Sequence, residues 1–178
     1  HIVYVTSSSL SGISDKRREN ETLYVLKKLG VKRSQITFIG KKLLIPDLAL
    51  KDNLKKAYKN CKVFLDKLGN VNTIYSHAYE GGHPDHDALN FICSKLIQNS
   101  KSKIYGWQFP LYCGPGLIGP LFYLFKPLKS NGKLKIKNID FKHIGLFLRL
   151  IFSYRSQFKT FIGLYPFYVL HMIFKRNS

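Results

Sequence analysis

The chain has 178 residues, enough for one compact domain with a sizeable core that needs no disulfide or metal to stabilise it. Its three cysteines are widely spaced and odd in number, which excludes a Cys-x-x-Cys zinc ribbon or redox pair and favours a reducing, cytoplasmic compartment. The formal net charge of +19 suits nucleic acid, anionic lipid or a phosphorylated substrate. Lysine, asparagine, isoleucine and phenylalanine are all plentiful, however, so we expect a solvated basic surface with no dedicated nucleic-acid partner.

The predicted elements of the first third alternate between strand and helix. Residues 2–6 form an apolar run that predicts a strand, and a helix follows over residues 14–30, with Gly30 just after its last turn. Residues 35–40 predict a second strand. An irregular stretch that contains a proline is expected over residues 41–50.

The middle third repeats this alternation with a stronger periodicity. Apolar residues at helical spacing predict a long helix over residues 51–69, and residues 73–77 predict a third strand. The apolar positions from Leu89 to Ile97 match a further helix. The loop at residues 79–86 therefore joins the carboxyl end of a strand to the start of a helix, where open α/β sheets bind their ligands. The alternation itself is typical of an α/β domain with a mainly parallel sheet.

Residues 98–178 form a more divergent, basic and aromatic part of the chain. Residues 104–112 predict a strand and residues 114–119 a loop, and lysines alternating with apolar residues over 133–141 predict an exposed edge strand. The apolar stretch 161–174 contains a proline and is shorter than the roughly 20 residues of a membrane-spanning helix. We expect a core or surface-lying segment there, with peripheral membrane contact as a second interpretation.

The loop His83-Pro84-Asp85-His86 carries the clearest chemistry of the sequence. It places two imidazoles and a carboxylate within one tight turn. A neutral imidazole is a good zinc ligand, and a neighbouring carboxylate can orient a ring or help to move a proton. Taken alone, the His-x-x-His spacing is a weak signal, because two histidines in a surface loop are more often solvated than bound to metal.

The segment from His77 to Ala88 resembles the second metal-site motif of the PIG-L/LmbE-like de-N-acetylases, a Gly-His-Pro-Asp-His loop that stands here at residues 82–86. Shorter stretches resemble the same family in the same order along the chain. They are the strand ending at Thr6, Arg18-Glu19-Asn20-Glu21, Leu29-Gly30-Val31, Phe38-Ile39-Gly40, Pro46-Asp47 and Tyr154-Arg155-Ser156-Gln157. The resemblance covers residues 1–97 and is patchy over residues 98–178.

The resemblance implies a Rossmann-like three-layer sandwich with a mainly parallel sheet whose first strand is missing, in a single domain of residues 1–178. It implies a zinc-dependent hydrolase that removes the N-acetyl group from an amino sugar of the N-acetylglucosamine type and releases acetate. The implied cofactor is one Zn²⁺ ion, and the implied location is cytoplasmic or peripheral to a membrane.

The resemblance also implies roles for three residues of the loop. His86 would be a zinc ligand. His83 would face the developing oxyanion, stabilise it and protonate the leaving amine. Asp85 would tune a neighbouring group.

Substrate-binding residues are implied in the same way. Arg18 would reach toward the hydroxyls or the phosphate of the substrate, and Tyr79 and Glu80 would line the pocket. A second interpretation of Arg18 is an ion pair on the helix surface with Glu21, three positions later.

The first motif of the family, His-Pro-Asp-Asp-Glu, does not occur in the 178 residues. In the family it supplies two zinc ligands and the catalytic base, and it lies on the strand before the one that opens this chain. A catalytic zinc site needs three protein ligands and a water molecule, so we expect the chain as given to be inactive. We expect an incomplete N-terminus rather than a degenerate relative, because His1 opens directly onto a strand without a methionine.

Two other classes of function compete with the enzyme. The first is a non-catalytic relative that keeps the sugar pocket. The second is a basic nucleic-acid-binding domain, against which the chain has no helix-turn-helix, zinc-finger or RNA-binding signature. The lysines that would serve it are Lys126, Lys129, Lys133, Lys135, Lys137 and Lys142.

Overall fold

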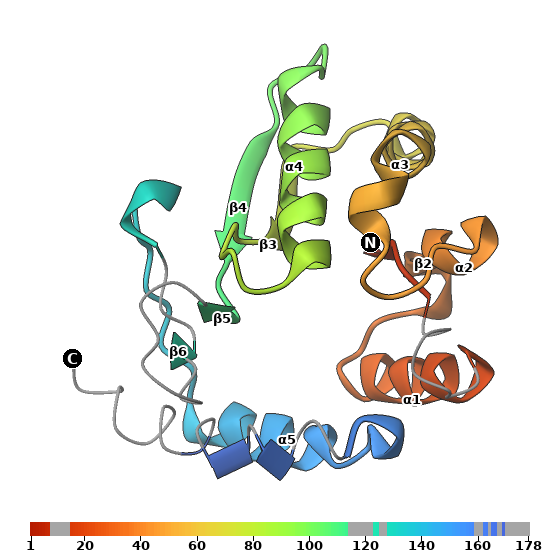
Figure 1. Ribbon diagram of the computed structural model, residues 1–178. Helices are drawn as coiled ribbons and strands as arrows, with labels where there is room; N and C mark the ends of the chain where they lie inside the picture. The colour runs from red at the N-terminus through yellow and green to blue at the C-terminus, as the bar shows by residue number, and fades with distance from the viewer. Residues whose placement is uncertain are drawn as a thin grey trace.

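The structure, a computed structural model, describes residues 1–7, 15–113, 123–124 and 128–158, with residues 162–163, 165–166 and 169 beyond them. Helices and short strand pairs alternate along the chain (Figure 1), which confirms the predicted mixed α/β fold. The α-helices are α1 (Asp15–Lys28), α2 (Ile39–Leu43), α3 (Leu54–Leu68), α4 (Pro84–Gln98) and α5 (Phe141–Ile151). Short 3₁₀ turns are η2 (Arg33–Gln35), η3 (Leu50–Asn53), η4 (Lys129–Asn131) and η5 (Arg155–Gln157).

The strands form separate pairs in the described part of the chain. β1 (Ile2–Tyr4) runs parallel to β2 (Ile36–Phe38), with Val3 opposite Thr37. β3 (Thr73–His77) runs parallel to β4 (Tyr105–Phe109), with His77 opposite Phe109. A third, antiparallel pair joins β5 (Tyr112–Cys113) to β6 (Tyr123–Leu124). The two larger pairs are parallel, as the alternation of strands and helices predicts.

Local sequence signals define the ends of α1 and α3. The chain turns after each helix at a glycine with positive φ, +82° at Gly30 and +71° at Gly69, a conformation that glycine adopts at little cost. α3 buries Ala57 and Cys61 and exposes several lysines. Burial raises the pKa of the Cys61 thiol to about 12, so this cysteine is an unreactive core residue.

The second predicted strand is shorter than expected. β2 ends at Phe38, and Ile39 and Gly40 already belong to α2, which occupies part of the stretch expected to be irregular. A Cβ atom at Gly40 would lie 2.4 Å from backbone atoms of Thr6. Glycine therefore lets the first turn of α2 lie against the end of β1, a tertiary contact that ends the strand early.

The prediction of an edge strand over residues 133–141 is wrong. Residues 132–140 have no regular secondary structure and are exposed, and α5 begins at Phe141. Asp140 caps this helix by accepting a hydrogen bond from the His143 amide (2.8 Å). An alternating pattern forms a strand only with a partner, and no described strand pairs with this segment.

Two further predictions concern parts of the chain of which the structure describes few residues or none. Residues 114–119 lie outside the described residues, and of the stretch 161–174 only five residues are described. Within the described ranges, none of the helices combines the length and the apolar character needed to cross a bilayer.

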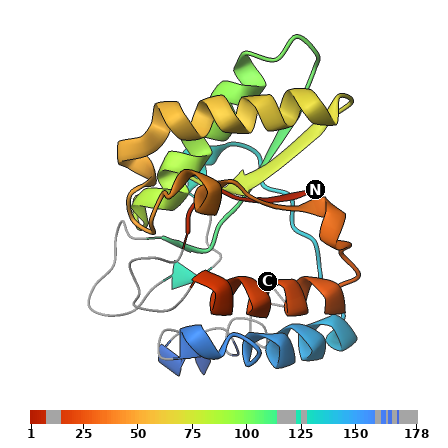
Figure 2. The same cartoon turned by 90° about the vertical axis from the view of Figure 1, so that its right-hand side faces the viewer.

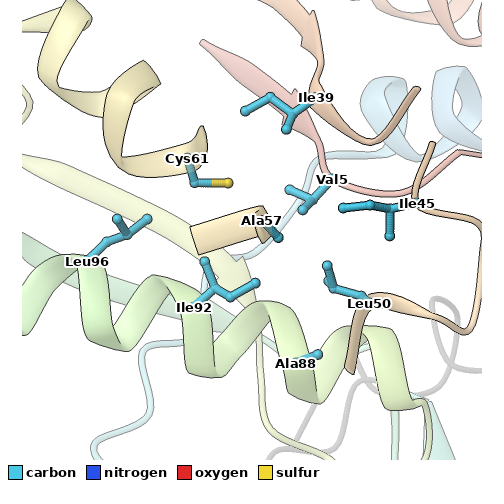
Figure 3. Packing of buried hydrophobic residues seen from close by; sticks show 9 residues of the cluster. All are labelled: Val5, Ile39, Ile45, Leu50, Ala57, Cys61, Ala88, Ile92 and Leu96. Atoms are coloured by element: carbon cyan, nitrogen blue, oxygen red, sulfur yellow. The ribbon is translucent and has the colours of Figure 1, made fainter. Parts of the chain in front are cut away.

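The hydrophobic core lies between α3, α4 and the end of β1 (Figure 3). Ile45 and Leu50, which flank the turn after α2, are its largest fully buried aliphatic side chains together with Ile92. The other members of the cluster are Val5, Ile39, Ala57, Cys61, Ala88 and Leu96. α5 lies alongside α1, away from α3 and α4 (Figures 1 and 2). The start of α4 and the turn at residues 45–50 are therefore held by the same core.

Candidate functional site

The loop that follows β3 leads directly into α4, as predicted. His83 is the N-cap residue, and its Nδ1 accepts a hydrogen bond from the Asp85 amide (3.2 Å). Pro84 occupies the first helical position, where a missing amide proton costs nothing. Because Nδ1 of His83 accepts this hydrogen bond, the ring carries a proton on Nε2.

Asp85 is a buried anchor of this site. Its carboxylate accepts hydrogen bonds from the Leu48 amide (2.7 Å) and the Leu50 amide (3.0 Å), and the residue is 7% exposed. Leu48 has a φ of +68°, so this turn is strained and needs such support. The carboxylate expected to tune a catalytic group therefore holds the turn at residues 48–50 against the start of α4.

Asp87 closes the loop on its other side, a role that the sequence reasoning missed. Its Oδ1 accepts hydrogen bonds from the amides of Glu80 (2.9 Å) and Gly81 (3.2 Å), and Gly81 has a φ of +66°. An acidic residue in the first turn of a helix after a glycine-rich loop was the available signal.

Glu80 is buried beneath the loop. It is 1% exposed, and its Oε1 accepts a hydrogen bond from the Leu111 amide (2.6 Å), while its Oε2 lies 3.6 Å from Nδ1 of His86. Tyr79 is half-exposed, and its carbonyl accepts a hydrogen bond from the Asn131 side chain (2.8 Å). Neither Tyr79 nor Glu80 lines the cavity described below, so the structure does not bring them to that cavity with the other predicted site residues.

Three histidine rings form a stack at the carboxyl end of β3. The ring of His86 stacks on His77 with 4.1 Å between centroids, and on His83 with 4.4 Å. Burial, followed by the neighbouring His77 and His83, lowers the pKa of His86 to about 3. Burial and His83 also lower the pKa of His77. Both rings are therefore neutral near pH 7, the state in which imidazole binds metal.

His77 was singled out only as the start of the matching segment, yet it belongs to this stack. Its Nδ1 is buried and makes no hydrogen bond in the described structure. Its carbonyl accepts a hydrogen bond from the Asn90 side chain (2.9 Å), which ties β3 to α4. The last residue of a strand that leads into a His-containing loop was the signal for it.

Arg18 pairs with Asp47 and not with Glu21. Its Nη1 lies 2.6 Å from Oδ2 of Asp47, and both side chains are about a quarter to a third exposed. Glu21 instead lies 3.3 Å from Nε of Arg17 and accepts a hydrogen bond from the Ser156 amide (3.1 Å). The prediction of a surface ion pair between Arg18 and Glu21 is thus wrong, because Arg18 pairs with Asp47, which is more distant in the sequence.

A large open cavity of about 1420 Å³ brings these groups together. Residues 1–6 line it from β1 and residues 75–77 line it from β3. Four of the six predicted site residues line the same cavity: Arg18, His83, Asp85 and His86. Asp47 and His77 line it as well, and a smaller hollow of about 220 Å³ adjoins Arg18 and Asp47.

The donor set for a metal is incomplete in the described ranges. They contain no group of three His, Cys, Asp or Glu side chains arranged to hold a metal ion. The two oxygens of Asp85 are already occupied by amides, and His83 uses Nδ1 as a cap. His86 is neutral and lines the cavity, so its chemistry suits one metal ligand.

Comparisons with protein-family models, with curated proteins and with solved structures found no match to this chain.

Proposed function

We propose that this chain forms the larger part of a zinc-dependent de-N-acetylase, which hydrolyses the N-acetyl group of an amino sugar of the N-acetylglucosamine type. The observation that carries the proposal is one shared cavity. His83 and His86 line it from the carboxyl end of β3, and Arg18 lines it from α1. Imidazoles and a guanidinium around a wide cavity suit an acetylated sugar with hydroxyl or phosphate groups.

Zn²⁺ is the cofactor in this proposal. His86 suits one ligand position because its ring is neutral and lines the cavity. Since the residues described contain no complete ligand set, the proposal assigns the remaining ligands to a segment that precedes β1. When bound, zinc would polarise the amide carbonyl and activate water for attack on it.

The residues of this chain would bind the substrate and stabilise the charge that develops on it. The Nε2–H group of His83 would donate a hydrogen bond to the developing oxyanion. Asp85 holds the turn at residues 48–50 against α4 and so fixes the positions of His83 and His86 at the start of this helix. Arg18, oriented by Asp47, would bind hydroxyls or a phosphate of the sugar.

The strand arrangement supports the finer part of the fold that the resemblance implies. β1 and β3 both line the cavity, and each belongs to a parallel pair. A parallel strand inserted between them would give the order β2–β1–inserted strand–β3–β4. This is the order of a doubly wound Rossmann-like sheet, whose switch point is the usual ligand site. The inserted strand would bring the missing ligands beside His86.

The test begins with the gene segment upstream of His1. We expect it to encode a His-Pro-Asp-Asp run about one helix and one loop before β1. The protein extended through this run should bind one zinc ion and release acetate from an N-acetylglucosamine-type substrate. A His86→Ala variant should lose both zinc and activity, whereas the matched His143→Ala variant, in an exposed position on α5, should keep both.

The competing outcome is equally clear. If the upstream segment carries no such run, or if His86→Ala leaves the zinc content unchanged, the enzyme proposal fails. Binding of N-acetylglucosamine without acetate release would then identify a non-catalytic relative that keeps the sugar pocket. Loss of sugar binding in Arg18→Ala would locate that pocket, because Arg18 lines the cavity.

A further inference from the structure

The segment that leads into α5 exposes large apolar side chains. We call residues 132–141 the basic–apolar segment. Leu134 is 64% exposed, Ile136 is 70% exposed and Phe141 is 73% exposed. Ile139 is also exposed. Single exposed apolar residues are ordinary on a protein surface, but four large ones in ten residues form a local patch.

The lysines of this segment alternate with its apolar residues. Nζ of Lys135 lies 5.5 Å from the centroid of the Trp107 ring, so Lys135 faces the β3–β4 pair. Its neighbours Leu134 and Ile136 are the strongly exposed residues. In this segment a cation therefore faces the protein and aliphatic side chains face outward, the reverse of the usual surface arrangement.

The surroundings of the segment are strongly basic. Residues 128–158 contain seven lysines and arginines and one acidic residue, Asp140. Lys133 and Lys137 within the segment, and Lys142 directly after it, are exposed. A partner for this surface must therefore offer negative charge together with an apolar layer.

We propose that the basic–apolar segment binds the surface of an anionic lipid bilayer. Lys133, Lys137 and Lys142 would meet the lipid headgroups. Leu134, Ile136 and Phe141 would enter the boundary between headgroups and acyl chains. Nucleic acid would satisfy the lysines but would leave the outward aliphatic side chains in water. The bilayer surface is the partner that uses both halves of the pattern.

The proposal is tested with the full chain and lipid vesicles, in the absence of zinc, so its outcome does not depend on the deacetylase proposal. The vesicles consist of phosphatidylcholine with about one quarter phosphatidylserine, and of phosphatidylcholine alone. Trp107, the only tryptophan of the chain, lies under Lys135 and reports binding. We expect co-sedimentation with the anionic vesicles only, and a shift of tryptophan emission to shorter wavelength that raised salt weakens.

Two sets of variants separate the apolar contribution from the charge. Leu134→Ser with Ile136→Ser should weaken vesicle binding at least about tenfold, because apolar burial is lost without a change of charge. Leu44→Ser, at an exposed leucine after α2, is the control and should bind normally.

The charge variant replaces Lys133, Lys137 and Lys142 by Gln and should weaken binding about a hundredfold. Its matched control replaces the exposed Lys55, Lys59 and Lys67 of α3, which changes the net charge equally and should weaken binding less than about threefold.

Equal weakening by both lysine triples, or normal binding of the Leu134 and Ile136 variant, would overturn the proposal. So would stronger binding to a random DNA duplex than to the anionic vesicles at the same ionic strength.

Discussion

The loop after β3 and the segment before α5 each lead into a helix, but they treat their charged residues in opposite ways. In the loop, Asp85 and Asp87 are hydrogen-bonded to backbone amides, and Glu80 is buried. In the segment at residues 132–140, every residue is exposed. The difference teaches that carboxylates can fix a short connection in place when they accept hydrogen bonds from backbone amides that would otherwise bind water. In the segment at residues 132–140 the one carboxylate, Asp140, accepts a hydrogen bond from an amide in the first turn of α5, and the residues before it stay exposed.

The largest test of this comparison removes the Asp85 anchor. Asp85→Ala leaves the amides of Leu48 and Leu50 without their acceptors in a buried setting. We expect the free energy of unfolding to fall by about 3 kcal/mol. Urea denaturation measures it, with Asp52→Ala, an exposed aspartate in the adjacent turn, as the control that should change stability by less than about 0.5 kcal/mol. Equal effects of the two variants would contradict the anchoring role.

A second test uses pH in the presence of a chelator. The folded protein holds the pKa of His86 at about 3 and also lowers that of His77, whereas an unfolded histidine titrates near 6.5. The unfolded state therefore binds more protons between these values. Stability should be fully present above pH 6.5 and should fall as the pH drops toward 3, by at most about 1.4 kcal/mol per pH unit for each histidine.

Comparison of unfolding at pH 7.5 and pH 5.5 isolates this effect from the carboxylates, which titrate at lower pH. His86→Gln should flatten the dependence, and His143→Gln, at an exposed position on α5, should leave it as in the original protein. If His86→Gln keeps the full dependence, the burial of its ring is not the cause.

A third, smaller test concerns how the end of α5 joins the rest of the molecule. Oγ and the amide of Ser156 both donate hydrogen bonds to Glu21 on α1. Ser156→Ala removes the first of these, and we expect a loss of about 1 kcal/mol. Faster amide hydrogen exchange at residues 155–157 would report local loosening of η5. Ser153→Ala, three positions earlier, should change neither measurement, and an equal effect there would contradict the specific contact.

The smallest effect is expected in the exposed segment. Leu134→Ser with Ile136→Ser should change the free energy of unfolding by less than about 0.5 kcal/mol, because both side chains are already in water. Thermal unfolding without vesicles measures it. A loss above about 2 kcal/mol would show that these side chains pack inside the fold, and the contrast with the loop after β3 would disappear.

Several elements could be predicted because their signals are local. Residues 73–77 form β3, and the helix after the His-containing loop begins at Pro84, where proline and the preceding His83 define a helix start. Gly30 and Gly69 mark the ends of two helices by their positive φ angles. The position of the loop at the carboxyl end of a parallel strand followed from the alternation of strands and helices. The four predicted site residues that line the cavity were implied by the family resemblance instead.

The partners of the polar side chains were decided only by the tertiary structure. Asp85 reaches a turn that lies 35 to 37 positions earlier in the chain, and Glu21 meets Ser156 across 135 positions. The edge strand expected over residues 133–141 failed for the same reason, since a strand requires a partner from elsewhere in the chain. Periodicity and caps depend on neighbours within a few residues, so the sequence alone determined α1, α3, α4 and most strand positions, but not α2 or α5. Hydrogen-bond partners and burial depend on segments that meet only when the chain folds. A polar group loses its bound water on burial, and the free energy of its contact then depends on which group replaces that water.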